Sequence, residues 1–74
     1  MTDDEYRHGI LALEDEYTTT IRKLLIRRSE RNKTFARLPQ LIYFTPEAAN
    51  IAQLRDKQMD EHERAYYRER GFDV

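Results

Sequence analysis

The sequence contains no cysteine and no tryptophan, and only two glycines and two prolines occur among its 74 residues. Without thiols, the chain can form neither a disulfide framework nor a cysteine zinc site, and it has no thiolate nucleophile. A reducing, cytoplasmic location is the expectation for such a chain. Because glycine and proline are scarce and helix-forming residues are abundant, the composition predicts an all-α fold.

Long hydrophobic runs are missing as well. An uninterrupted apolar stretch such as Leu41–Phe44 is far shorter than the roughly 20 residues that a membrane-spanning helix needs. The first residues are acidic, whereas a secretory leader begins with basic ones, so we expect no targeting signal and no membrane contact. Charged residues make up 36% of the chain, which leaves few side chains for a core. We therefore expect one small helical domain over residues 1–74.

A first helix is predicted over about residues 3–31. Thr2 and Glu5 have the spacing of a capping box, in which the Thr2 hydroxyl accepts a hydrogen bond from the Glu5 amide. The next apolar residues recur every three or four positions and so share one helix face. They are Tyr6, Ile10, Leu13, Tyr17, Ile21 and Leu24. Gly9 and the threonines at 18–20 disfavour a helix, so this one needs a packing partner.

A second helix is predicted over about residues 46–70. Thr45 is a typical N-cap, Pro46 suits the first helical position, and Gly71 suits the residue after the helix end. The inward face holds Ala48, Ile51, Ala52 and Met59 together with Arg55, His62 and Tyr66. We expect His62 to be half-buried and hydrogen-bonded, because the acids next to it in sequence point in other directions around the helix and cannot share a metal ion with it.

The connector, residues 32–44, shows no helical periodicity and contains Pro39, which would break a helix. Its apolar residues predict a segment that folds back across the two helices, with a short strand over Leu41–Phe44 as an alternative. Residues 71–74 are expected to form a short tail. The fold expected is thus an antiparallel two-helix hairpin, and so small a hairpin is completed by forming an oligomer or by docking on another protein.

Charge is distributed unevenly although the formal net charge is only -1. Residues 1–20 hold six acidic residues and one basic residue, and residues 21–40 hold seven basic residues and one acidic. Such a basic block suits an acidic protein surface or the phosphates of a nucleic acid. A purely structural explanation exists as well, because bases favour the C-terminal end of a helix. The sequence pI of about 6.1 disfavours a dedicated nucleic-acid-binding domain.

From these features we expect a non-catalytic protein–protein interaction module: a small adaptor, inhibitor or assembly factor whose partner is a larger protein with an acidic patch. Tyr67 is predicted to lie exposed among arginines, a composition typical of binding hot spots. The predicted docking residues are Arg27, Arg31, Arg37, Tyr67 and Arg68. The alternative is a dimeric nucleic-acid-binding regulator that uses Arg22, Lys23, Arg27, Arg31 and Lys33. No catalytic, metal-binding or cofactor-binding pattern is found, so no enzyme activity, metal or cofactor is expected.

Overall fold

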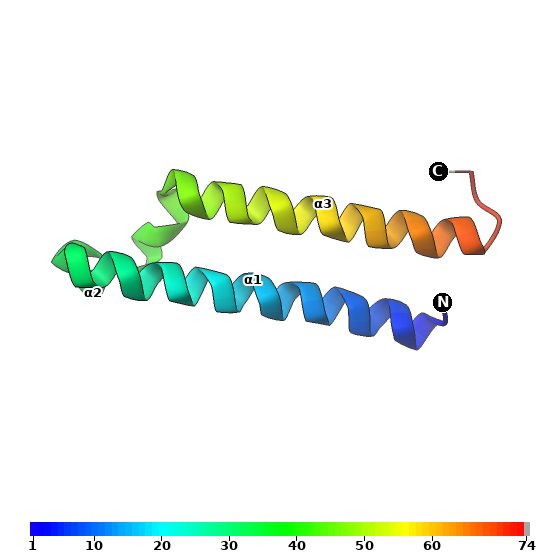
Figure 1. The fold of residues 1–74 in the computed structure, drawn as a ribbon, viewed down its shortest axis with the longest axis horizontal. Helices are drawn as coiled ribbons and strands as arrows, with labels where there is room; N and C mark the ends of the chain where they lie inside the picture. Colours follow the sequence, from blue (N-terminus) through cyan, green and yellow to red (C-terminus); the bar gives the residue numbers. More distant parts are fainter. Residues whose placement is uncertain (74) are drawn as a thin grey trace.

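The computed structural model describes residues 1–73 as four helical segments, two of them long. In chain order these are α1 (Asp3–Arg31), α2 (Lys33–Arg37), the 3-10 helix η1 (Pro39–Phe44) and α3 (Pro46–Glu69). No strand occurs among the described residues, so the all-α prediction is confirmed. The two long helices lie side by side and run in opposite directions (Figure 1), which gives a rod of 51 by 20 by 14 Å.

The N-terminal ends of both long helices are set by threonine caps, as the sequence indicates. The hydroxyl oxygen of Thr2 accepts a hydrogen bond of 3.2 Å from the backbone N–H of Glu5. The hydroxyl oxygen of Thr45 accepts one of 3.3 Å from the backbone N–H of Ala48. Each cap satisfies a backbone donor that has no partner within its helix.

The C-terminal end of α3 is a Schellman motif built on Gly71. This glycine has a φ of 91°, in the left-handed region that favours glycine. Its N–H donates to the carbonyl of Arg68, and the N–H of Phe72 donates to the carbonyl of Tyr67. These two bonds satisfy the last carbonyls of the helix and end α3 at Glu69. Of the predicted tail 71–74, position 74 lies outside the described residues.

The prediction of a non-helical connector over residues 32–44 is wrong. The side chain of Asn32 accepts a hydrogen bond of 2.9 Å from the N–H of Thr34 and so starts α2 directly after α1. Pro39 is the first residue of η1, where its missing N–H costs nothing. Residues 41–44 belong to this 3-10 helix and do not form a strand. Both segments are too short for helical periodicity to be visible in the sequence.

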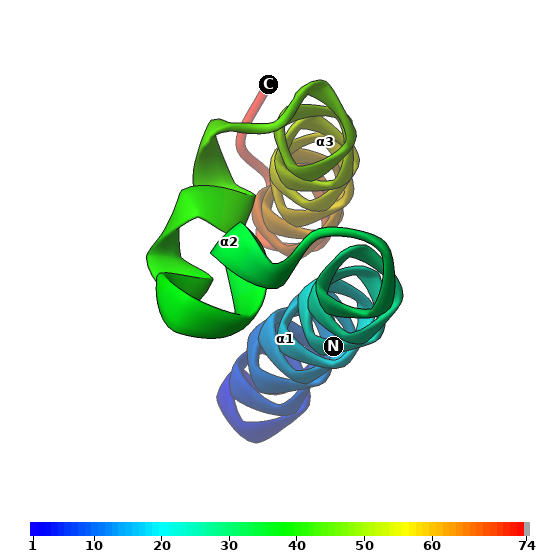
Figure 2. The same ribbon diagram turned by 90° about the vertical axis from the view of Figure 1, so that its left-hand side faces the viewer.

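The core lies at the end of the rod where η1 packs against both long helices and α2 packs against α1 (Figure 2). Its buried side chains are Ile21, Leu24, Ile42 and Ala48. Ile42 on η1 is the most deeply buried of them, at 1% exposed. We call residues 17–57 the connector half, because this part of the chain contains the connecting helices and the core. Residues 1–16 and 58–73 form the terminal half, in which α1 and α3 have only each other.

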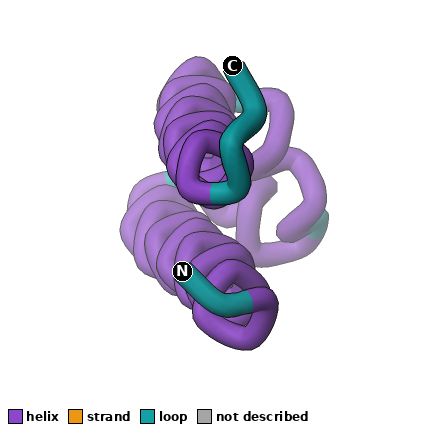
Figure 3. Tube along the Cα trace, turned by 90° about the vertical axis from the view of Figure 1, so that its right-hand side faces the viewer, coloured by secondary structure: helices purple, strands orange, loops and turns teal. Residues whose placement is uncertain are grey.

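The first and the last described residues lie at the tip of the terminal half (Figure 3). Aromatic side chains hold the two helices together there. The ring of Tyr6 stacks on the His62 ring, with centroids 5.3 Å apart, and lies tilted against the Tyr66 ring at 4.4 Å. His62 is half-buried and its Nε2 lies 3.0 Å from the carbonyl oxygen of Tyr6, which confirms the expectation for this histidine. No described residue of the terminal half is fully buried.

Gly9 makes room for this contact. A Cβ atom at position 9 would lie 2.3 Å from the His62 ring, closer than any real contact. Glycine costs about 1 kcal/mol relative to alanine inside a helix. The close approach of His62 explains why this residue is tolerated in the middle of α1.

The aspartate at the start of α1 joins the two helices at their outer end. Asp3 accepts hydrogen bonds from the Tyr66 hydroxyl and from the Arg70 guanidinium, which also lies 4.4 Å from the centre of the Tyr66 ring. The Tyr66 bond, and next the charge of Arg70, lower the pKa of the Asp3 carboxyl. The same hydrogen bond raises the pKa of the Tyr66 hydroxyl.

Candidate functional site

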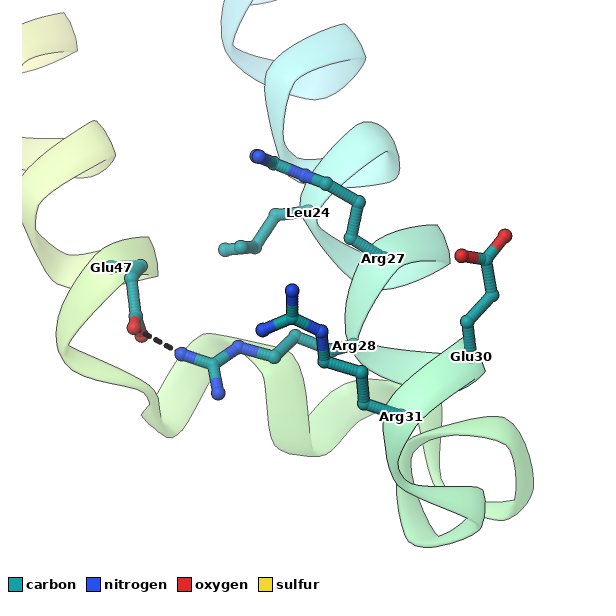
Figure 4. Close-up of a pocket in the computed structure, with 6 residues that line it drawn as sticks. All are labelled: Leu24, Arg27, Arg28, Glu30, Arg31 and Glu47. Carbon is teal, nitrogen blue, oxygen red and sulfur yellow. Dashed lines mark hydrogen bonds and ion pairs between the residues drawn. The ribbon is translucent and has the colours of Figure 1, made fainter.

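Three arginines of α1 extend into one open hollow of about 510 Å³ at the connector end (Figure 4). The hollow lies between the last two turns of α1 and the first turn of α3. Its lining residues are Leu24, Arg27, Arg28, Glu30, Arg31 and Glu47. We call it the arginine hollow. The buried side chain of Leu24 gives it an apolar floor.

Among the described residues, a carboxylate neutralises only one of the three arginines. Arg28 is half-buried and forms an ion pair with Glu47 across the hollow. Glu47 lies in the first turn of α3, where the helix dipole stabilises its negative charge. Glu30 also lines the hollow, but its carboxylate points away from the guanidinium groups (Figure 4).

Arg27 and Arg31 are therefore available to an external anion. Both side chains are exposed, and neither forms an ion pair with a described residue. Guanidinium groups bind carboxylates through two parallel hydrogen bonds, so two of them over an apolar floor suit an acidic side chain of a partner.

The wider connector half is strongly basic. Nine basic and three acidic residues occur at positions 17–57, whereas the rest of the chain has four basic and eleven acidic residues. The antiparallel arrangement produces this division, because it places the acidic start of α1 beside the acidic end of α3. Several exposed bases of the connector half have no ion pair among the described residues. They are Arg22, Lys23, Arg27, Arg31, Lys33, Arg37 and Lys57.

Large hydrophobic side chains are exposed at the same end of the molecule. Phe44 is 82% exposed and Tyr43 is 59% exposed, although both are neighbours of the buried Ile42. Leu38 and Ile26 are exposed as well. Aromatic residues next to arginines are the composition enriched in protein interfaces. The connector half thus combines exposed aromatic side chains with bases that have no ion pair among the described residues.

The five predicted docking residues do not form one surface. Arg27 and Arg31 line the arginine hollow, and Arg37 ends α2 at the same end of the rod. Tyr67 and Arg68 lie near the end of α3, at the opposite end (Figure 1). Tyr67 packs edge-on against Tyr66 and Phe72, with ring centroids 5.4 and 5.6 Å away, so it serves the C-terminal cap.

The alternative set of bases also divides between two sides of α1. Arg27 and Arg31 line the arginine hollow, whereas Arg22 lines a separate hollow with Pro39 and Tyr43 of the connecting segment. The bases predicted for nucleic acid therefore do not form one continuous ridge on the folded protein.

Sequence reasoning missed Arg28. Its position continues the inward face of α1, four residues after Leu24, where a hydrocarbon is the usual choice. An arginine at such a position signals an ion pair, but its partner could be found only by knowing that the end of α1 meets the start of α3. Arg55 on the inward face of α3 is a related case, because its guanidinium lies 4.1 Å from the centre of the Tyr17 ring.

Comparison with protein-family models, with curated proteins and with solved structures finds no match to this chain. No helix of the described residues is long and apolar enough to cross a membrane. Within the same residues, no three histidine or acidic side chains are grouped to hold a metal ion. The function is therefore inferred from the surface of the molecule itself.

Proposed function

We propose that this protein is a non-catalytic interaction module, an adaptor, inhibitor or assembly factor that docks its connector half on an acidic surface of a larger protein. The observation that carries the proposal is the arginine hollow, in which Arg27 and Arg31 extend into open space without a carboxylate partner in the described chain. The exposed side chains of Tyr43 and Phe44 at the same end supply apolar area for the contact.

The contact combines two physical terms. Carboxylates of the partner that enter the hollow accept hydrogen bonds from Arg27 and Arg31, while Glu47 keeps Arg28 in place. Burial of an exposed aromatic side chain contributes roughly 1.5 to 3 kcal/mol. Charge therefore orients the partner and the aromatic residues add affinity.

An acidic protein fits this surface better than a nucleic acid does. The eleven acidic residues outside positions 17–57 would repel an extended polyanion, and the cations near the connector are divided between two sides of α1. The overall pI of about 6.1 points the same way.

The proposal is tested by affinity capture from a nuclease-treated lysate of the native host, with mass spectrometry as the readout. The wild-type chain is compared with an Arg27→Glu/Arg31→Glu variant, which removes no ion pair among the described residues. The control is an Arg7→Glu/Arg64→Glu variant, which has the same change in net charge at exposed positions of the terminal half. It also removes the exposed ion pair of Arg64 with Asp60, and such surface pairs contribute little to stability.

We expect the wild type and the control to retain one acidic protein that the Arg27→Glu/Arg31→Glu variant loses. Titration of the purified partner should then show at least about tenfold weaker binding to that variant, as for a lost charge-paired contact. Equal retention by all three chains contradicts the proposal. Retention that is seen in a parallel untreated lysate but not in the nuclease-treated one supports the nucleic-acid alternative.

We also propose that the hairpin of two long helices is completed by an oligomer. In the terminal half, the described side chains of α1 and α3 are all at least partly exposed, because no third element covers them. A second protein surface along the helix pair would supply the missing layer.

A further inference from the structure

A shallow groove runs between the long helices at the middle of the rod. Its lining residues are Leu13, Glu16, Tyr17, Thr20, Ile51, Leu54, Arg55 and Gln58. We call it the central groove. Leu54 is 57% exposed at its edge, although it lies near the middle of α3. Because the helix pair has so few buried residues, a large apolar side chain at this position is expected to be buried, and its exposure is unexpected.

The central groove and the arginine hollow lie along one face. On α1, the step from Thr20 in the groove to Arg27 in the hollow is seven residues, and Arg31 follows after four. On α3, Glu47 of the hollow is followed by Ile51 and Leu54 of the groove after steps of four and three. Such steps keep side chains on the same side of a helix. We call this side the groove face.

Charge changes sign along the groove face. Beyond the groove toward the connector end, Lys23 joins Arg27 and Arg31 on the same side of α1. Toward the chain ends, the same helical steps place the exposed acids Glu5 on α1 and Glu61 on α3. These five side chains form no ion pairs with described residues. At the basic end, Glu47 is paired with Arg28, and the carboxylate of Glu30 points away from the arginines. The groove between the two ends is lined by apolar side chains together with one acid, Glu16, and one base, Arg55. The face thus carries an excess of bases, then a partly apolar centre with balanced charge, then acids.

A surface with this order complements itself when one copy is turned end over end. Two copies in antiparallel orientation place the bases of each over the acids of the other and cover both central grooves. A parallel pair would place like charges opposite one another. Contact through the terminal halves alone would bring together two segments that each hold eleven acidic and four basic residues. Only the antiparallel arrangement satisfies both charge and apolar area.

We propose that the groove face is the interface of an antiparallel homodimer, with Leu54 of both copies near its centre and the arginine hollow of each copy over the acidic terminal half of the other. The inference specifies the oligomer proposed above and rests on that proposed function. Because the dimer covers Arg27 and Arg31, a second copy and the acidic partner compete for the same arginines.

The first test is sedimentation velocity of the purified full chain over a range of concentrations. Leu54→Glu places a charge at the centre of the interface and should weaken self-association by at least about tenfold. Leu11→Glu is the matched control, because Leu11 is 56% exposed on α1 but lies beside Tyr6, Arg7 and Ile10 and outside the groove. A wild-type chain that stays monomeric up to millimolar concentration overturns the proposal, and so does equal weakening by both variants.

The second test exchanges the charges between two chains. Arg27→Glu/Arg31→Glu makes both ends of the groove face acidic, and Glu5→Lys/Glu61→Lys makes both ends basic. Each variant alone should be monomeric where the wild type is dimeric, and an equimolar mixture should form a heterodimer. Far-UV circular dichroism confirms that both fold. A mixture that remains monomeric overturns the antiparallel arrangement, whatever the single variants do.

The two proposals fail separately. Self-association is measured on the purified chain, without any partner, whereas docking is measured by capture. The Leu54→Glu chain keeps Arg27 and Arg31, so it should still capture the acidic partner. It should capture more of the partner than the wild type does, because no second copy covers these arginines. If the dimer forms but no acidic partner is captured, only the docking proposal is contradicted. If the partner is captured but no dimer forms, only the homodimer proposal is contradicted.

Discussion

The absence of a side chain at position 9 decides how closely the long helices approach in the terminal half. Alanine would favour the helix by about 1 kcal/mol. Its Cβ atom would however displace the His62 ring, which would lose its hydrogen bond to the Tyr6 carbonyl and its stacking on the Tyr6 ring. These two contacts are together worth roughly 1 to 3 kcal/mol. We expect Gly9→Ala to lower the free energy of unfolding by about 1 kcal/mol, measured by urea denaturation.

The control for this prediction is the same substitution without the histidine. In a His62→Ala background no ring occupies the space, so Gly9→Ala should raise the free energy of unfolding by up to about 1 kcal/mol. A change of sign between the two backgrounds is the specific outcome. If Gly9→Ala stabilises both chains, the close approach of the two helices at position 9 does not contribute to the free energy of unfolding.

Asp3 makes the terminal half sensitive to acid. Its hydrogen bond from Tyr66, and then the charge of Arg70, lower the pKa of the carboxyl in the folded state. A lowered pKa adds stability above the unfolded-state value of about 4, and this stability is lost as pH falls through the folded-state pKa. The melting temperature of the wild type should exceed that of Asp3→Asn at pH 7, and the two should converge as the pH falls through the folded-state pKa of Asp3. A constant difference across this range would contradict the assignment.

Among the elements, η1 contributes to the core and to the proposed docking surface through neighbouring residues. Ile42 is 1% exposed, so Ile42→Ala should cost about 2 to 5 kcal/mol, a large share of the stability of so small a protein. Phe44 is 82% exposed, and Phe44→Ala should change stability by less than about 0.5 kcal/mol. The same Phe44 substitution should weaken capture of the acidic partner. Thermal melts and capture assays on both variants measure the two effects.

A helix end can be predicted from the sequence when the residues that determine it are close to it in the chain. Thr2, Thr45 and Gly71 act within a few residues of the helix ends that they set, so those ends are readable without tertiary information. The connector is different, because η1 packs Ile42 against both long helices and this burial is not visible in sequence. The Asn32 cap of α2 was a local signal that helical periodicity alone does not reveal.

The same distinction applies to the candidate site. Arg27 and Arg31 follow from the basic block of the sequence, and the structure places both in the arginine hollow. Arg28 was missed because its role depends on Glu47, which is 19 residues away. Tyr67 was predicted to lie on the same surface, but the antiparallel fold places the end of α3 at the opposite end of the rod from the start of the connector. The pattern of charged and aromatic residues in the sequence does not contain this information.

For the molecule as a whole, stability is expected to differ between its two halves. The buried side chains of the described core all lie in the connector half, so opening should begin in the terminal half. Hydrogen exchange, measured at a concentration where the chain is monomeric, should show slower exchange for amides of residues 21–25 than for those of residues 6–10. Equal protection of the two segments would show that the two-helix end is as stable as the covered end.

The separation of charge along the rod also determines how the molecule behaves in an external electric field. A net charge of -1 suggests a nearly neutral particle, yet an excess of bases and an excess of acids lie at opposite ends of a body 51 Å long. Such a body has a large permanent dipole moment and turns to align with the field, which transient electric birefringence detects. Cation and anion exchange resins should each retain it near neutral pH, bound by opposite tips.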